Sequence, residues 1–562
     1  MIQESATIDL LNVQIKIPTS GFILGRGKLN IDTLGPGSSA LQWVSYLAKG
    51  TRLNSVRGGK RSGVTNTMEV GTLSIVLRET GISVDDGNLI PNTPIRFIAA
   101  GSSAPFFTGT ISDIDYAYEY DKGNNVIVKF TTISAVDAVQ SLANTVRYGA
   151  LSPSGNESWE DRMNRLFSSA LVPVSIPAVA GPATKYTLPP SLDGWSNYGA
   201  TPAGVVQQAL RSDTVFLFYG NPTKALVREN SAAADQVLYD GTVGIQRTLT
   251  GLTVGKLYRI DATAGYAGSE NPLAQHVPNR YKLGVIGVGS GTVGFGFAER
   301  STPYPLETYY FVATASSHQI AVLLGETVIL EGGVEGESLF VSSLKVQEIQ
   351  SLSTYVLQDV VYESSLLNHF DLACMSANAF WWVDRSGVTQ FSSALAGGSS
   401  VATFTDARSA GRLEYVSMFA TFDTRSTVND LELTNHGAMD DPEKPGNIIA
   451  NDLTENFKDD TSIATWGPRT ASADVSLYEG GSQAGAVARR AAELTLGTSN
   501  PARTVTRIRW NAQENPALVA SLEIYSLIDV IFQGSTQQSR IVNIRHDVTP
   551  SRWMITLELI RR

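Results

Sequence analysis

The chain has 562 residues, of which 43% are hydrophobic and 17% are charged, with 50 Gly and 23 Pro. This length predicts about three to five domains, and the composition excludes a disordered tail. The net charge of −10 argues against a general binder of nucleic acid or of anionic membranes, since both need basic faces. One cysteine, Cys374, excludes an internal disulfide framework and a zinc site built from several thiolates.

The whole charge imbalance lies in residues 351–502, whose charges sum to −10. The N-terminus lacks a basic region followed by an apolar one, so we expect no signal peptide. Because no run approaches about 18 apolar residues, we expect no transmembrane segment and synthesis in the cytoplasm.

The first 150 residues have the pattern of an antiparallel β domain. In Thr72–Leu77 and Val126–Thr132, apolar residues alternate with polar ones, as in half-buried strands. Gly and Asn at 86–88 and 122–124 favour turns. Helical spacing in Ser134–Tyr148 predicts a short helix that closes this domain.

Residues 158–171 predict one amphipathic helix, with Ser158 as N-cap and Asp161 three residues later. In residues 175–350 short strands recur between turn signals, which favours a β-sandwich. The predicted strands there are Leu257–Thr263, Tyr281–Val288, Thr308–Ala315 and Gln319–Leu324.

The helical spacing returns in Thr354–Met375, followed by a hairpin in which Ala379–Val383 and Val388–Phe391 flank a turn at Gly387. Further on we expect a helix at Gln483–Leu496 and two closing strands, Ser539–Arg545 and Arg552–Ile560. We therefore predict a mainly β, multidomain chain: a β domain at 1–150, a small α+β domain split between 151–175 and 350–399, a sandwich inserted at 176–349, and a β domain at 400–562.

The residue types of a catalytic or metal site do not come together in this sequence. None of the five His residues pairs with another at metal-ligand spacing. Cys374 and His369 could form a nucleophilic pair, but a cysteine in an apolar run is usually a small buried hydrophobe. The Gly-rich stretch at 289–296 lacks the Lys of a phosphate loop. Pairs such as Asp113/Asp115 fit solvated loops better than glycoside cleavage. We expect no enzyme activity, no catalytic residue, no metal and no cofactor.

Two sets of residues are candidates for binding. The first is a basic segment that either stays solvated or docks against an acidic surface of another subunit: Arg52, Arg57, Lys60 and Arg61. The second consists of aromatic residues in the sandwich region, which either pack in its core or stack on sugar rings: Trp195, Tyr198, Tyr281, Tyr304 and Tyr309.

Several motifs resemble those of the baseplate hub proteins of long-tailed bacteriophages, often called minor tail or tail tip proteins. In order, these motifs are Phe22–Gly25, Val56-Arg57-Gly58, Val70–Leu73, Pro94-Ile95-Arg96, Phe107–Ile111 and Asp137–Leu142. Later segments agree with the same family: Ala379–Asp384 with Gly387, Ser462 with Trp466-Gly467, Ile541–His546 and Trp553–Leu559. The resemblance covers residues 1–175 and 350–562.

The inserted region, with Thr248–Tyr258 and Tyr310–Thr314, resembles a carbohydrate-binding type of jelly roll. Many modules of this appearance are spacers. Hub proteins with lytic activity carry an added catalytic region, and none follows Arg562 in this sequence.

The family resemblance implies a structural protein of the virion, located in the tail tip or baseplate. It implies two tube-like β-barrel domains, at 1–150 and 400–562, and a ring of three copies that closes the end of the tail tube. The expected partners are further copies of the chain as a homotrimer, the distal tail protein and tail tube, the tape-measure protein, the tip or receptor-binding proteins, and host glycans through the sandwich. Nucleic acid is not expected.

Two alternatives remain open at the level of the sequence. One is a tail-associated cell-wall hydrolase, which would cleave peptidoglycan, and the other is an adhesin for host glycans.

Overall fold

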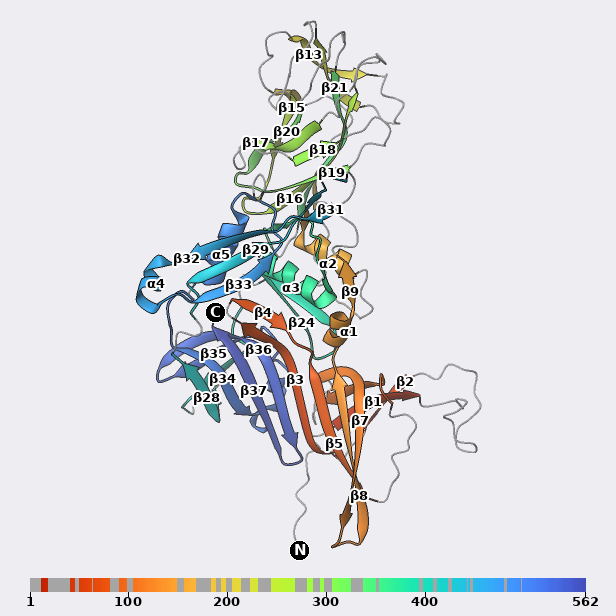
Figure 1. Cartoon of the computed structure of the whole chain (residues 1–562), viewed down its shortest axis with the longest axis vertical. Helices are drawn as coiled ribbons and strands as arrows, with labels where there is room; N and C mark the ends of the chain where they lie inside the picture. The colour runs from red at the N-terminus through yellow and green to blue at the C-terminus, as the bar shows by residue number, and fades with distance from the viewer. Residues whose placement is uncertain are drawn as a thin grey trace, which may run out of the picture.

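A computed structural model of the chain shows a mainly β protein with several sheets (Figure 1). The structure describes residues 12–18, 41–45, 50–62, 64–80, 90–98, 105–148, 156–167, 183–187, 194–198, 205–213, 223–230, 244–267, 280–286, 294–297, 306–324, 337–349, 353–393, 398–407, 412–422, 427–441, 443–444, 448–479, 483–496 and 498–561.

The largest sheet has 15 strands and draws on both ends of the chain. Its N-terminal part runs in the order β2-β1-β6-β7-β8-β5-β3, with β4 paired to β3, and all of its pairs are antiparallel. The strands are β1 (Asn12–Pro18), β2 (Leu41–Ser45), β3 (Gly50–Ser62), β4 (Thr65–Met68), β5 (Thr72–Thr80), β6 (Pro94–Ile98), β7 (Phe107–Asp121) and β8 (Val126–Val136). We call this part the N-terminal β unit.

The C-terminal part of the same sheet runs β27-β26-β35-β36-β37-β34-β28, and we call it the C-terminal β unit. Only the pairs β26–β27 and β26–β35 are parallel among its described strands. The strands are β26 (Ala402–Thr405), β27 (Leu413–Glu414), β28 (Ser417–Thr421), β34 (Thr504–Asn511), β35 (Leu527–Phe532), β36 (Ser535–Thr549) and β37 (Arg552–Arg561), with the short helices η3 (Ala512–Glu514) and α6 (Pro516–Val519) between β34 and β35.

Alternation of apolar and polar residues explains these strands. In β5, Leu73, Ile75 and Leu77 are buried, as their spacing predicts. In β37, Trp553 and Ile555 are fully buried on the predicted core face. Strands β36 and β37 contain the two predicted closing strands and pair with each other in antiparallel orientation. One face of the large sheet is therefore the core face, and its other face is partly open to solvent.

A small helical layer packs on the core side of the N-terminal β unit. It contains α1 (Val139–Asn144), α2 (Trp159–Phe167), α3 (Leu366–Ala377) and the hairpin β24 (Ala379–Val383) with β25 (Thr389–Ser393). The predicted N-cap of α2 is confirmed, because the Ser158 hydroxyl accepts from the Asp161 N–H at 3.2 Å. The predicted hairpin is confirmed too, with Gly387 at a φ of +82°.

Two predicted helices are shorter in the structure. The helix expected at Thr354–Met375 begins only at α3, where the Ser365 side chain accepts from the Asn368 N–H and caps it. The residues before it form the short strands β22 (Val356–Leu357) and β23 (Glu363–Ser365), which pair with β10 (Glu157–Ser158) and β9 (Val146–Tyr148). The helix expected at Ser134–Tyr148 shrinks to α1, because β8 stays paired with β5 up to Val136.

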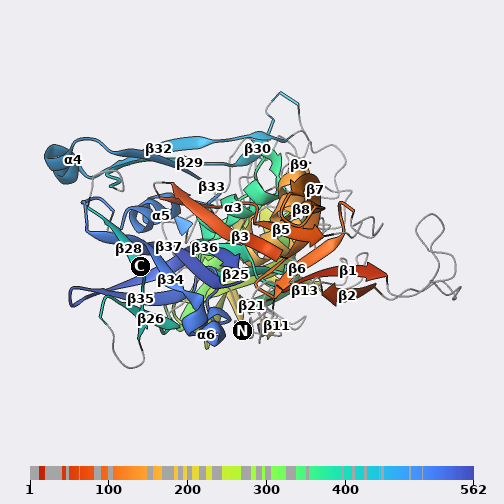
Figure 2. The same cartoon turned by 90° about the horizontal axis from the view of Figure 1, so that it is seen from below.

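A second, three-stranded sheet lies beyond α3, in the order β32-β29-β33. Helix α3 packs against β33 and α5 against β29, and the view from below shows both helices between this sheet and strands β36 and β37 (Figure 2). The elements are β29 (Asp430–Asn435), β32 (Leu453–Lys458), α4 (Asp460–Trp466), β33 (Thr470–Val475) and α5 (Ala486–Thr495), with the small pair β30 (Ala438–Asp440) and β31 (Ile448–Ala450). Residues 400–562, expected as one β domain, therefore contribute strands to several sheets.

The inserted region forms two sheets of a sandwich, one with six strands and one with five. The first contains β11 (Ala183–Thr187), β13 (Val205–Asp213), β14 (Thr223–Asn230), β16 (Leu257–Ala267), β19 (Leu306–Val312) and β21 (Glu337–Ile349). The second contains β12 (Trp195–Tyr198), β15 (Gly244–Thr250), β17 (Arg280–Ile286), β18 (Gly294–Phe297) and β20 (Ser317–Leu324).

The sandwich connects to the rest of the chain at one place. Its first and last described strands, β11 and β21, are paired, and the flanking strands β10 and β22 are paired as well. At this place the Tyr310 hydroxyl donates to the Asp161 carboxylate at 2.8 Å, and burial, followed by the charge of Asp161, raises the pKa of Tyr310. Figure 1 shows the sandwich at the opposite end of the long axis from the β7–β8 hairpin.

Within the described part of the chain, no helix is both long enough and apolar enough to cross a membrane.

Candidate interaction surface

The two β units are joined by direct pairing of β3 with β36. Leu53 faces Val548 and Gly58 faces Asn543 in an antiparallel register, on the same edge of β36 that pairs with β35 further along. Gly58 has a φ of +124°, and a Cβ at this position would lie 2.2 Å from the carbonyl oxygen of Val542. A glycine is therefore required at this position of the β3–β36 pairing.

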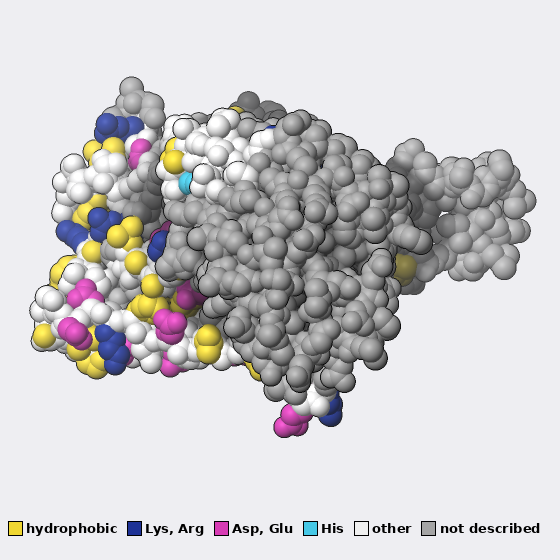
Figure 3. Space-filling view, turned by 90° about the horizontal axis from the view of Figure 1, so that it is seen from above, with side chains coloured by type: hydrophobic (Ala, Val, Ile, Leu, Met, Phe, Trp, Pro, Cys, Tyr) yellow, Lys and Arg dark blue, Asp and Glu magenta, His cyan; other side chains and the backbone are white. Residues whose placement is uncertain are grey.

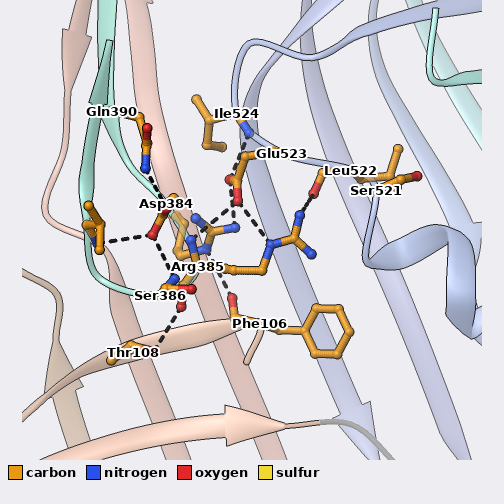
Figure 4. Close-up of polar contacts among 12 residues, drawn as sticks. Phe106, Thr108, Asp384, Arg385, Ser386, Gln390, Ser521, Leu522, Glu523 and Ile524 are labelled. Atoms are coloured by element: carbon orange, nitrogen blue, oxygen red, sulfur yellow. Dashed lines mark hydrogen bonds and ion pairs between the residues drawn. The ribbon is translucent and has the colours of Figure 1, made fainter. Parts of the chain in front are cut away.

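A buried ionic cluster holds the same junction together (Figure 4). Arg57 is 3% exposed and lies 3.0 Å from the Glu523 carboxylate, which also accepts from the Arg385 guanidinium at 3.2 Å. The Arg57 guanidinium donates in addition to the carbonyl oxygens of Phe106 and Val383, both at 3.1 Å. These contacts join the N-terminal β unit, the β24–β25 hairpin and the C-terminal β unit.

The charges of this cluster shift the pKa values of two groups. Burial would raise the pKa of Glu523, but Arg57, the Ile524 N–H and Arg385 with its own N–H together outweigh it and lower that pKa. Burial, then the same two arginines, lowers the pKa of His546 to about 3. Neutral His546 accepts a hydrogen bond from the Trp553 indole N–H at 3.2 Å and packs against Phe106 with ring centroids 5.7 Å apart.

On the open face of the large sheet, β3, β28, β34, β36 and β37 line a groove of about 780 Å³. Its charged lining consists of Arg52, Lys60, Arg507, Arg509 and Arg545 against Glu69, Asp547 and Glu558. Phe419 of β28 lies in its wall, with the Arg507 guanidinium 4.8 Å from its ring centroid. The groove is therefore mildly basic and has an aromatic edge. From above, the described surface mixes hydrophobic and charged side chains (Figure 3).

The structure separates the four basic residues predicted to dock a partner. Arg52 and Lys60 are exposed on the groove face, and Arg52 lies 3.8 Å from Asp547. The expectation that Arg57 docks a partner is corrected, because its guanidinium is buried and pairs with Glu523 of the same chain. The Arg61 side chain lies outside the described residues.

Of the five aromatic residues predicted to contact glycans, the structure places one side chain. Tyr309 is only 5% exposed, so its ring is packed inside the sandwich and has no free face for a sugar, which corrects that expectation. Trp195, Tyr198 and Tyr281 lie in β12 and β17, but their side chains are outside the described residues, as is all of Tyr304.

The described residues give little support to a nucleophilic cysteine or to a catalytic pair of carboxylates. Cys374 is buried, and burial followed by the Asp371 carboxylate raises the pKa of its thiol, which is the reverse of activation. Asp113 and Asp115 are exposed on β7. No group of three or more His, Cys, Asp or Glu side chains that could hold a metal occurs among the residues described.

Sequence reasoning missed three parts of this surface. Glu523 and Arg385 gave no signal, because an ion pair between residues so far apart leaves no local pattern. The third part is an exposed stripe of Tyr116, Tyr118 and Tyr120 on β7, where Tyr118 is 65% exposed. Its signal was visible, since tyrosines at alternate positions of a strand share one face.

No protein-family model matches the chain, and neither does any curated protein. Among solved structures, it is similar to the 43 kDa tail protein of prophage MuSo2 from Shewanella oneidensis, at 9% identity and a TM-score of 0.40, with 98% of each chain covered. It is also similar to a tail protein from Neisseria meningitidis MC58, at 9% identity and a TM-score of 0.41, with 98% of this chain and 96% of the other covered. A xylan-binding domain of CBM 22 is similar over 30% of this chain and 97% of its own length, at 15% identity and a TM-score of 0.19.

Proposed function

We propose that the chain is a structural hub protein of a phage tail, located at the tail tip or baseplate. The observation that carries the proposal is the β3–β36 pairing, through which one chain presents two β units side by side in a single sheet. Three such chains would present six β units, which matches the sixfold symmetry implied for a tail tube. The order of sequence motifs in residues 1–175 and 350–562 supports the same proposal.

In this proposal the ring of three copies closes the tail tube around the tape-measure protein. The distal tail protein and the tube would contact the ring, and the tip or receptor-binding proteins would be carried by it. The buried Arg57–Glu523–Arg385 cluster supports this mechanical role, because it fixes the angle between the two β units of each chain.

The inserted sandwich would extend from the ring and touch host glycans. Its attachment through one place in the chain and its distance from the β units in Figure 1 support a role outside the ring. A glycan array with the full chain, compared with a chain lacking residues 176–349, tests this part. Equal signals from both would leave the sandwich as a spacer.

The experiment that tests the hub proposal is an image of the phage particle at subunit resolution, with an antibody against an epitope tag on the chain. We expect three copies at the end of the tail tube. A label elsewhere on the particle, or a single copy per tail, would contradict the proposal. Turnover of purified peptidoglycan by the isolated chain would favour a tail-associated hydrolase instead.

A further inference from the structure

In the large sheet, part of β7 and the whole of β28 have one edge that no described strand covers. Beyond Ile111, whose backbone bonds to Thr93, strand β7 has β8 as its single neighbour among the described strands. At the other end, β28 has β34 as its single described neighbour. The path β7-β8-β5-β3-β36-β37-β34-β28 therefore runs from one free edge to the other through both β units.

Edge strands normally carry charges, proline or bulges that prevent pairing with another chain. Each edge has one β-bulge, between Phe419 and Ala420 in β28 and between Ile111 and Asp113 in β7, and β7 also carries acidic residues. Beyond its bulge, β7 keeps an unbroken register with β8. The segment from Val416 to Phe422 contains no charged residue and no proline, and its Phe419 is 55% exposed. On β7 the exposed Tyr116, Tyr118 and Tyr120 lie beyond the body of the molecule, in the hairpin that Figure 1 shows projecting at one end.

The two edges have complementary charge on the open face of the sheet. Pairing places one row of side chains on this face: Val136, Thr72, Val56, Arg545, Thr556, Arg509 and Ser417. At the β28 end, Arg507 and Phe419 form the next pair on this face. At the β7 end, Asp115 and Glu119 lie on it, because Asp115 faces Thr132 and Glu119 faces Val128. The same face is thus acidic at one edge and basic at the other.

The core face matches as well. The tyrosine stripe is on this side of β7, where Tyr116 faces Thr131 and both Tyr116 and Tyr118 cover the Lys129 ammonium, at 4.3 Å and 5.9 Å from their ring centroids. On β28 the same side carries Met418, which packs against the core, and Ala420. Tyrosine rings would cover these apolar groups once the strands lay side by side.

We propose that the β7 edge of one copy pairs with the β28 edge of a second copy and continues the large sheet between subunits. Asp115 and Glu119 then meet Arg507 and Arg509 of the second copy, while Tyr116 and Tyr118 cover its Met418. This contact is head to tail, so it leaves a free edge on each copy and closes only as a ring. The inference rests on the proposed hub function, and it names the surfaces by which the copies join.

The first test is charge reversal in the full chain, read out as self-association by analytical ultracentrifugation. We expect Asp115→Arg with Glu119→Arg, or Arg507→Glu with Arg509→Glu, to weaken association at least about tenfold. An equimolar mixture of the two variants should recover mixed assemblies, because reversed edges attract each other. Leu496→Ser, at an exposed apolar residue outside both edges, should leave association unchanged.

The second test is cross-linking between copies, which the single buried cysteine makes selective. A mixture of Ala117→Cys and Ser417→Cys chains should be joined by a short bismaleimide, since both positions lie on the open face. A mixture of Ala117→Cys with Leu496→Cys chains should not be joined.

Self-association that survives both charge reversals, with no cross-link between positions 117 and 417, would overturn the edge pairing and leave the hub function standing. A chain that does not self-associate would overturn it too. If the edges pair as proposed but the tagged chain is absent from the tail tip, the hub function alone fails.

Discussion

At the scale of single residues, buried charges join the two β units. Arg57 lies in the basic segment that we expected either to stay solvated or to dock, yet its guanidinium is buried against Glu523 and two carbonyl oxygens. Local sequence gives the charge but not the burial, because Glu523 reaches Arg57 only through the tertiary fold. A charge buried with its partner is costly to leave unpaired.

We therefore expect Glu523→Gln to lower the free energy of unfolding by about 3 to 5 kcal/mol, because it removes the carboxylate that pairs directly with the buried Arg57. Urea denaturation monitored by tryptophan fluorescence measures this loss. Asp547→Asn is the matched control, since it removes the partner of the exposed Arg52 and should change stability by about 1 kcal/mol or less. A loss from Glu523→Gln as small as that from the control would contradict a role for the cluster in stability.

The second residue-scale prediction concerns acid. His546 has an ordinary pKa of 6.5 that falls to about 3 in the fold, so its contribution is present above 6.5 and is lost as the pH falls. As the pH falls from about 7.5 to about 5, we expect the shifted pKa of His546 to lower the free energy of unfolding of the wild-type chain by about 2 kcal/mol. The His546→Gln chain should not show this loss. Both chains share the same buried carboxylic acids, so the effects of those acids cancel when the free energies of unfolding of the two chains are subtracted.

His436 provides a control of opposite sign. The Asp474 carboxylate, 3.4 Å away, and then Asp452, at 3.0 Å, raise the pKa of His436 despite its burial. Its contribution is complete below the ordinary pKa and is lost as the pH rises through the higher one. We therefore expect His436→Gln to be less stable than the wild-type chain, with the difference in free energy of unfolding largest in acid. Unfolding measured at a series of pH values tests this. Equal pH dependence of the two variants would contradict both assignments.

At the scale of elements, the alternation of apolar residues predicted β5 and β37 correctly, because each has one buried face. The start of α3 could not be predicted from helical spacing, since Val356 and Leu357 have that spacing but pair with β10. The basic segment from Arg52 to Arg61 was described without a predicted strand, and the structure places it in β3, which also contains Gly58 and Gly59. Both glycines are there for close contact between backbones, a use that sequence alone does not distinguish from a turn.

We expect Gly58→Ala to weaken the joint between the β units by about 3 kcal/mol or more, because it combines a strained φ of +124° with a contact of 2.2 Å. Gly534→Ala is the control, at a φ of +78° with no atom within 4 Å of the added Cβ, and should cost about 1 to 2 kcal/mol. Thermal unfolding of the two variants compares them. Equal losses would show that backbone strain, and not the approach of β36, sets the cost at Gly58.

At the scale of the whole molecule, the sandwich could be predicted from the sequence, because the pattern changes from helical to strand-like where the inserted region begins. The structure has two sheets there. The sharing of one sheet by both ends of the chain left no such signal, because partners in β3 and β36 have no local relation. For the same reason, the grouping of β29, β32 and β33 with the helices is visible only in the fold.

We expect a chain in which a short Gly-Ser linker replaces residues 176–349 to keep the rest of its fold, because β10 and β22 on either side of the insert are already paired. It loses the Tyr310–Asp161 hydrogen bond and a small apolar contact at Val356. Calorimetry should show one unfolding transition missing and the other only slightly lowered. Loss of both transitions would show that the sandwich is part of the main core.

The pairing of Leu53 with Val548 also governs the order of events during synthesis. During synthesis β36 (Ser535–Thr549) emerges long after β3 (Gly50–Ser62), so the β3 edge of the N-terminal β unit stays open while all the residues between the two strands are translated. Contacts of such long sequence separation slow folding, and an open strand edge invites aggregation. The newly made chain therefore has its greatest need of chaperones in the interval before β36 leaves the ribosome.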